Sequence, residues 1–145
     1  MNKRLITALA LACAMGAAHA ADRTVMLPIA AAMGSSDAEA KLDKSIAYRF
    51  GDQPFTGKTT SLGTDKTSQK TNAFGKSDDK ACNWVFLSAM LQLQKHAQAV
   101  GANAVVNIRS NYNNIEKSSA TEFECHAGAL MAGVALKADF VKTAQ

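Results

Sequence analysis

Cysteine and histidine are the residue types in this sequence whose spacing could support chemistry. Cys82 and Cys125 are 43 positions apart, and His126 directly follows the second cysteine. Two thiolates and an imidazole can together bind a soft transition metal, whereas two cysteines in an oxidising compartment form a disulfide. Adjacent residues of a strand point to opposite faces, so Cys125 and His126 cannot bind one ion without distortion. We therefore predict a Cys82–Cys125 disulfide and no metal site. The alternative is a metal set of reduced Cys82 and Cys125 with His126.

The sequence offers little for catalysis or nucleotide binding. Gly57-Lys58-Thr59 resembles the end of a phosphate-binding loop, but five residues rather than four separate it from Gly51. The polar segment that follows lacks the apolar period of the helix that such a loop must open into. No serine or cysteine stands in a nucleophile-elbow pattern. Glu122 and Glu124 share a strand face that we expect to be solvated. We predict that the protein is not an enzyme and carries no cofactor.

Two polar segments beside the strongest predicted helix form a candidate binding surface. They cover 70–79 and 111–114, and binding residues often occupy loops that a rigid element holds in place. The candidate residues are Lys70, Asn72, Phe74, Lys76, Asp78, Asn111 and Tyr112. Lysines near aromatic residues can also bind single-stranded nucleic acid, but Asp65 and Asp79 interrupt this run. We therefore expect a solvated surface and no nucleic-acid binding.

The first twenty residues have the build of a secretory signal peptide. Lys3 and Arg4 precede an apolar run over 5–14, and Ala18-His19-Ala20 is a small-residue cleavage site. The apolar run is too short to span a membrane, which takes about 20 residues. The alternative is a lipid anchor on Cys13, which lacks the usual branched aliphatic residue three positions upstream. We predict cleavage after Ala20 and a periplasmic or secreted location.

Cleavage changes the net charge and the number of cysteines in the chain. The whole sequence has 16 basic and 12 acidic residues, a net charge of +4, and three cysteines. Removal of 1–20 takes away two basic residues and one cysteine, which leaves a charge of +2 and an even cysteine pair. The basic balance therefore gives little support to nucleic-acid binding. We expect 21–145 to form a single domain.

One long helix is the element most clearly predicted. Ser77 and Gly101 are cap signals at the two ends of an amphipathic stretch that predicts a helix over 79–100. Its apolar positions, spaced by three and four, are Cys82, Val85, Phe86, Ala89, Met90, Leu93, Ala97 and Val100. Ser35 is a cap signal for a second, short helix that ends near Leu42.

The other predicted elements are strands. They cover 24–27, 46–50 and 104–108, with a polar strand near 59–62 inside a stretch of loop. In 121–141 the apolar residues change parity, which indicates one long strand with a β-bulge near Gly128 or Gly133. The predicted fold class is α+β, a small and mostly antiparallel sheet with the 79–100 helix packed on it and a short N-terminal helix. Both cysteines then face the same helix–sheet interface.

Four strings resemble a family of exported proteobacterial proteins often labelled excinuclease ATPase subunit. They are KTNAFGKSD (70–78), ACNWVFLSAM (81–90), GANAVVNIRS (101–110) and ECHAGALMAGVALKADFVK (124–142). The label implies nucleotide-driven DNA repair. The near-miss at Gly57-Lys58-Thr59 and the export signal do not support that activity.

The helix, the GANAVV string and the closing small-residue strand are also similar to YbjQ-like domains, described as heavy-metal-binding. They are similar as well to the sensor lipoprotein of the Rcs envelope-stress phosphorelay. These resemblances imply a long helix on a small sheet, a helix-to-strand disulfide that Cys82 and Cys125 could form, and self-association. We therefore expect a non-catalytic periplasmic binding or envelope accessory domain. Its expected partner is an envelope protein or a small ligand, and a homo-oligomer is left open.

Overall fold

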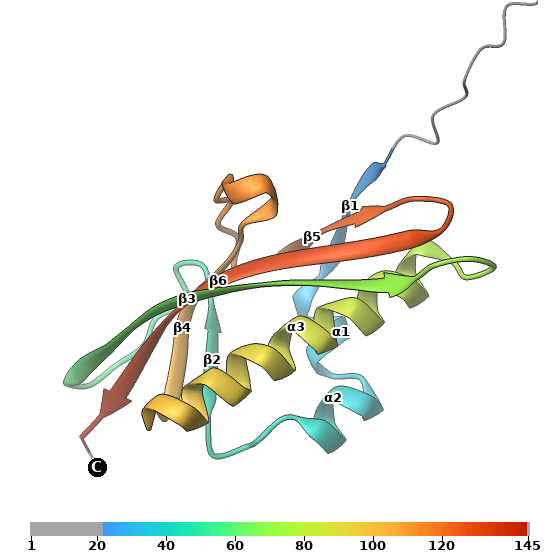
Figure 1. Cartoon of the computed structure of the whole chain (residues 1–145). Helices are drawn as coiled ribbons and strands as arrows, with labels where there is room; N and C mark the ends of the chain where they lie inside the picture. The colour runs from blue at the N-terminus through green and yellow to red at the C-terminus, as the bar shows by residue number, and fades with distance from the viewer. Residues whose placement is uncertain (1–21, 145) are drawn as a thin grey trace, which may run out of the picture.

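Strand β6 (Met131–Thr143) is the centre of the sheet (Figure 1). The structure is a computed structural model that describes residues 22–144. On one edge, β6 pairs along its whole length with β3 (Thr59–Asn72). On its other edge it pairs first with β5 (Glu122–Ala127) and then with β4 (Ala104–Ser110). These three pairings are all antiparallel.

Two short strands complete the sheet. β1 (Arg23–Pro28) lies antiparallel beside β5, and β2 (Ala47–Phe50) lies parallel beside β4. Pro28 ends β1 at the edge of the sheet, where a residue without an N–H group does no harm. The predicted α+β class with a mostly antiparallel sheet is confirmed.

Helix α3 (Asp78–Val100) crosses one face of this sheet (Figure 1). It begins as predicted at Ser77, whose Oγ accepts a hydrogen bond from the Lys80 N–H at 3.2 Å. It ends at Gly101, which takes the left-handed conformation with φ of 75°. The buried stripe of α3 packs against the inward residues of β5 and β6, and Phe86 stacks on Phe123 with ring centroids 4.2 Å apart. We call the opposite face of the sheet the outer face.

Two short helices precede β2. The predicted helix after Ser35 is α2 (Ser36–Lys41), and the Ser35 hydroxyl accepts a hydrogen bond from the Ala38 N–H. A second one, α1 (Ile29–Met33), was not expected from the sequence. None of the helices within residues 22–144 has the length and hydropathy that crossing a bilayer requires.

The prediction of one long bulged strand over 121–141 is wrong. The chain turns back at 128–130, and β5 and β6 form an antiparallel hairpin in which Ala127 pairs with Ala132. The Gly128 N–H donates to the Met131 carbonyl at 2.8 Å and closes the turn. The inward face therefore passes from odd numbers in β5 to even numbers in β6, and this shift is the parity change that the sequence displays.

The prediction of a mostly looped segment over 56–76 is also wrong. β3 has 14 residues and runs beside all of β6. Its sequence is polar because it is an edge strand, most of whose side chains are exposed. Threonine and serine are nevertheless compatible with strand geometry, and threonine favours it. Thr59 begins this strand and not a helix, so Gly57-Lys58-Thr59 lacks the context of a phosphate-binding loop.

Candidate functional site

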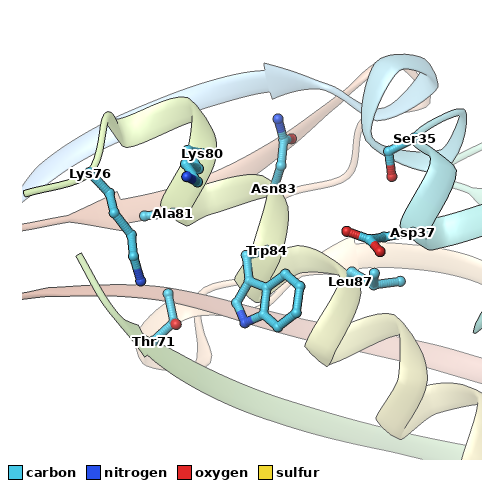
Figure 2. Close-up of a pocket in the computed structure, with 9 residues that line it drawn as sticks. All are labelled: Ser35, Asp37, Thr71, Lys76, Lys80, Ala81, Asn83, Trp84 and Leu87. Atoms are coloured by element: carbon cyan, nitrogen blue, oxygen red, sulfur yellow. The ribbon is translucent and has the colours of Figure 1, made fainter.

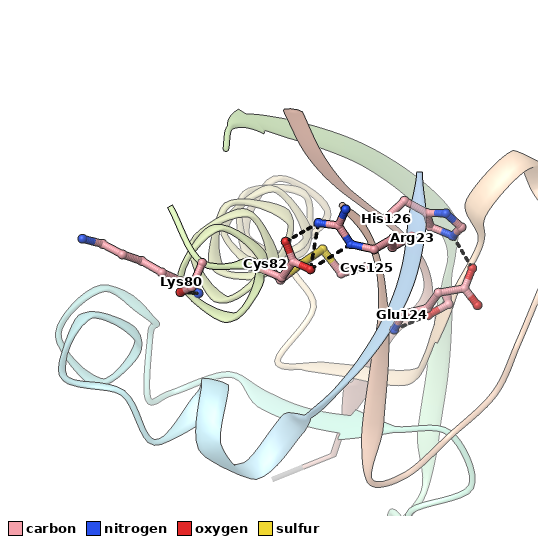
Figure 3. The surroundings of a disulfide bond; sticks show 9 residues. Arg23, Lys80, Cys82, Glu124, Cys125 and His126 are labelled. Atoms are coloured by element: carbon pink, nitrogen blue, oxygen red, sulfur yellow. Dashed lines mark hydrogen bonds and ion pairs between the residues drawn. A yellow bond between two sulfur atoms is a disulfide. The ribbon is translucent and has the colours of Figure 1, made fainter. Parts of the chain in front are cut away.

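A disulfide joins α3 to β5 on the face of the sheet that α3 covers (Figure 3). The sulfur atoms of Cys82 and Cys125 are 2.05 Å apart, and both residues are fully buried. Cys82 lies one turn into α3, on its buried stripe, and Cys125 points inward from β5. His126, the next residue, lies on the outer face, as strand alternation requires.

The connection between β4 and β5, residues 111–121, folds over the outer face (Figure 1). Its short helix η1 (Tyr112–Asn114) places the Tyr112 ring on His126, with ring centroids 3.3 Å apart and planes 8° apart. Lys117 extends back over β5, where its Nζ lies 2.7 Å from Oε2 of Glu124. Glu116 pairs with Lys137 of β6 at 2.6 Å. These contacts fix the β4–β5 connection against the sheet.

Glu124 is a buried carboxylate at the centre of these contacts. Its side chain is only 4% exposed, so the expectation that this strand face is solvated is wrong for Glu124. The reason is that the β4–β5 connection covers it. Its Oε1 lies 2.7 Å from His126 Nε2, and its backbone N–H donates to the Ser110 hydroxyl at 3.2 Å. Burial alone would raise the pKa of Glu124, but hydrogen bonds and ion pairs with Lys117 and His126 outweigh burial and lower it.

A polar pocket of about 440 Å³ opens between β3 and the β4–β5 connection. We call it the outer-face pocket. It is lined by Lys66, Ser68 and Lys70 of β3 and by Asn111, Tyr112, Asn113 and Asn114 of the connection. The structure thus brings together Lys70, Asn111 and Tyr112 of the predicted binding residues. Lys70 is far from the other two in the sequence, and the pairing of β3 with β6 brings it beside them.

The other four predicted binding residues lie at or near the turn between β3 and α3. The Asn72 carboxamide oxygen accepts a hydrogen bond from the Phe74 N–H, and the Lys76 ammonium donates to the Asn72 carbonyl, both at 2.8 Å. Phe74 itself is 72% exposed. Asp78 forms an ion pair with Arg23 at 2.9 Å. These residues therefore shape the turn and tie α3 to β1, and they do not line the outer-face pocket.

A second pocket, of about 360 Å³, surrounds Trp84 between α2, α3 and β3 (Figure 2). The indole is 50% exposed, and the Lys41 ammonium lies 4.8 Å from its ring centre. Lys76 and Asp37 both line this pocket, so it carries charges of both signs. Trp84 was not among the predicted binding residues, although an aromatic residue outside the apolar stripe of a helix is a usable signal.

The outer face also carries a row of cations that the sequence analysis did not identify. Lys66 of β3 stands directly opposite Lys137 of β6, which in turn stands opposite Arg109 of β4. Glu116 compensates Lys137 and Arg109, at 2.6 and 3.3 Å. Within residues 22–144, the Lys66 ammonium bonds only to the neutral carboxamide oxygen of Asn114, at 2.9 Å. The outer-face pocket lies at the Lys66 end of this row, where carboxylates compensate less of the positive charge.

The fold and the site define an α+β domain with a helix-to-sheet disulfide and a polar, cationic pocket on the outer face. The model of the YbjQ family, described as "Putative heavy-metal-binding", matches residues 67–137, from within β3 into β6. That segment contains α3, both cysteines of the disulfide and the β4–β5 connection. No curated protein and no solved structure was found to match the chain. The resemblances to the exported family and to the sensor lipoprotein stay predictions.

The donor atoms of residues 22–144 do not fit a heavy-metal site. Among residues 22–144, no three histidine, cysteine, aspartate or glutamate side chains are close enough together to hold a metal ion. Soft metals prefer thiolates, but both sulfur atoms are used in the disulfide. His126 bonds to Glu124 on the other face of the sheet. The structure therefore does not assemble the alternative set of Cys82, Cys125 and His126.

Proposed function

We propose that this protein is an exported, non-catalytic binding protein whose outer-face pocket holds a small anionic ligand. The observation that supports this most strongly is the charge of the pocket. Lys66 and Lys70 line it, and no aspartate or glutamate of the described residues does so. Lys70 forms no ion pair or hydrogen bond through its ammonium group within residues 22–144. A pocket with one sign of charge attracts ligands of the opposite sign.

The proposed site has a wall that is already in place. Three contacts within the protein anchor the β4–β5 connection: Lys117 with Glu124, Glu116 with Lys137, and Tyr112 on His126. A fixed wall lowers the entropy cost of binding, because fewer side chains must be ordered when the ligand arrives. The volume of the outer-face pocket, about 440 Å³, also lies within the range usual for small-molecule sites.

The proposal of a binding function without catalysis follows from the side chains available. The pocket offers ammonium, carboxamide and hydroxyl groups, which hold ligands, and a single phenol. Glu124 and His126 are an acid–base pair, but the His126 side chain is only 14% exposed beneath the stacked Tyr112 ring. A general acid or base must reach the proton that it transfers. This pair is better suited to holding the connection in place.

The test of anion binding is a chemical-shift titration of the protein purified from the periplasm, with inorganic phosphate and then acetate at constant ionic strength. We expect saturable shifts at Lys66, Lys70 and Asn111. K66Q/K70Q should bind at least about tenfold more weakly, since it loses both charges. The matched control is K58Q/K142Q, which removes the same charge from the residue just before β3 and from β6, at the far end of the sheet. Equal binding by both double variants would contradict the proposal.

The proposed export has a separate test. A mass spectrum of the protein from a periplasmic extract should give the mass of a chain that begins at Ala21. A chain that keeps residues 1–20 and stays in the cytoplasm would overturn this part of the proposal. The anion titration would still test the binding site, because it does not depend on where the protein is located.

Metal binding is the second candidate, because the family description favours it. It would require reduction of the disulfide, after which Cys82 and Cys125 would supply two thiolates. A zinc titration of oxidised and reduced protein decides the matter. Tight binding of one ion to the reduced form, lost in C82S/C125S, would support this candidate, and the same weak binding in all forms would exclude it.

A further inference from the structure

We propose that the ligand of the outer-face pocket is an anionic saccharide, that is, a sugar that carries a carboxylate or a phosphate. This inference rests on the proposed function and adds the chemical class of the ligand. Two observations support it: a carboxamide in the pocket wall that forms no hydrogen bond with residues 22–144, and a like-charge pair that the described residues leave partly uncompensated. The first accounts for the sugar hydroxyls, and the second accounts for the anionic group.

Asn111 supplies the first observation. The residue is only 7% exposed and lines the pocket, and its backbone N–H donates to the Ala135 carbonyl at 2.9 Å. Its side-chain carboxamide forms no hydrogen bond with any group of residues 22–144. The carboxamide atoms line the pocket and are therefore available to a ligand that supplies both a donor and an acceptor.

Sugar hydroxyl groups meet that requirement. A carboxamide has two N–H donors and one oxygen acceptor, and each hydroxyl is both a donor and an acceptor. Asn113 and Asn114 add two more carboxamides at the rim, held there by left-handed backbone conformations with φ of 52° and 59°. Ser68 adds a hydroxyl from β3. Simple anions such as chloride or acetate are too small to contact most of these groups at once.

The lysines supply the second observation. Lys66 and Lys137 face each other across β3 and β6, and like charges in this position destabilise a sheet. Glu116 neutralises Lys137, whereas Lys66 has, among the described residues, only the Asn114 carboxamide oxygen as a partner. Lys70 lies four residues further along β3, on the same face, and lines the same pocket. An anionic group between Lys66 and Lys70 would compensate both of these charges, and the sugar ring would then lie toward Asn111.

The test compares matched ligands on the protein from the periplasm by chemical-shift titration. Glucose 6-phosphate is compared with inorganic phosphate, glucuronate with acetate, and glucose serves as the uncharged sugar. We expect each charged sugar to bind about tenfold more tightly than its simple anion, the gain that one or two net hydrogen bonds provide. Glucose alone should bind more weakly than either charged sugar.

Variants then test which residues cause the preference for charged sugars over simple anions. N111A should bring glucuronate binding down to the level of acetate and leave acetate binding unchanged. S68A, on an exposed strand position, tests the same preference without a risk to folding. Equal affinity for charged sugars and simple anions would overturn the saccharide and leave the proposed anion site intact. No pocket shift with any ligand would overturn both, and glucose binding as tightly as glucuronate would overturn the charge requirement.

Discussion

At the scale of single residues, Glu124 shows what alternation along a strand can and cannot reveal. Alternation correctly separated Cys125 from Glu124 and His126, because neighbouring residues face opposite sides. It could not reveal that the β4–β5 connection, which directly precedes this strand, would cover the outer side. Burial of Glu124 depends on Lys117 and Ser110, which are tertiary contacts. The same contacts make Glu124 a sensitive point for stability.

Glu124→Gln should lower the free energy of unfolding by about 1–3 kcal/mol, since a buried carboxylate loses its charge-assisted partners. Lys117 and His126 would each face a neutral carboxamide in place of a carboxylate. Urea unfolding of the oxidised protein measures the effect. The matched control is Glu122→Gln on the same strand, where the side chain is exposed and a change below about 0.5 kcal/mol is expected.

The Glu124 carboxylate also predicts a pH dependence. Its pKa in the folded protein is lowered from the ordinary value of 4.5. A group with a lowered folded pKa stabilises the protein fully above its unfolded pKa, and that stabilisation is lost as the pH falls through the folded value. We expect stability to decline below pH 4.5. In E124Q the decline should be shallower, and an identical acid limb in both proteins would contradict this account.

At the scale of elements, the strength of the local signals decided what the sequence could predict. α3 carries a cap at each end and an unbroken apolar stripe, and it was predicted to within a residue or so. β3 carries no apolar pattern, because most side chains of this edge strand are exposed. The sequence therefore predicted only a short part of it as a strand. The hairpin was missed for another reason. A parity change is compatible with either a bulge or a turn, and only the pairing of Ala127 with Ala132 decides between them.

The candidate site depends on those missed elements. Lys70, Asn111 and Tyr112 were each selected from the sequence, yet the prediction grouped them with turn residues that lie elsewhere. Lys66 was not selected, because a lysine in a presumed loop gives no directional information. Placed on a strand opposite Lys137, the same lysine becomes an uncompensated charge. Strand register therefore carries the information that the local sequence lacked.

A glycine pair tests how the end of β2 is held. Gly51 takes a φ of 55°, and an added Cβ would lie 2.8 Å from the Ser119 carbonyl carbon. Gly75 takes a similar φ of 70° but has nothing within 4 Å of such a Cβ. G75A should cost about 1–2 kcal/mol from the backbone conformation alone. G51A should cost clearly more in the same urea assay, because the Ser119 backbone must also move, and equal losses would contradict that packing.

At the scale of the whole molecule, one covalent link joins the helix to the sheet. The chain is small, and small exported domains commonly use a disulfide to supplement a limited core. The Cys82–Cys125 bond closes a loop of 43 positions that contains most of α3, all of β4 and the whole β4–β5 connection. The same link therefore restricts, in the unfolded chain, the segments that build one wall of the outer-face pocket.

Reduction of the disulfide should lower the free energy of unfolding by about 4 kcal/mol, the chain-entropy value for a loop of this length. Urea unfolding with and without dithiothreitol measures the loss, and C82A/C125A should match the reduced protein and not respond to the reductant. Thiol titration of the denatured, unreduced protein should find no free thiol from this pair. Two free thiols, or the same stability in both redox states, would show that the link does not hold α3 to β5. Since the pocket wall is anchored by Glu124, next to Cys125, reduction should also weaken anion binding more than K58Q/K142Q does.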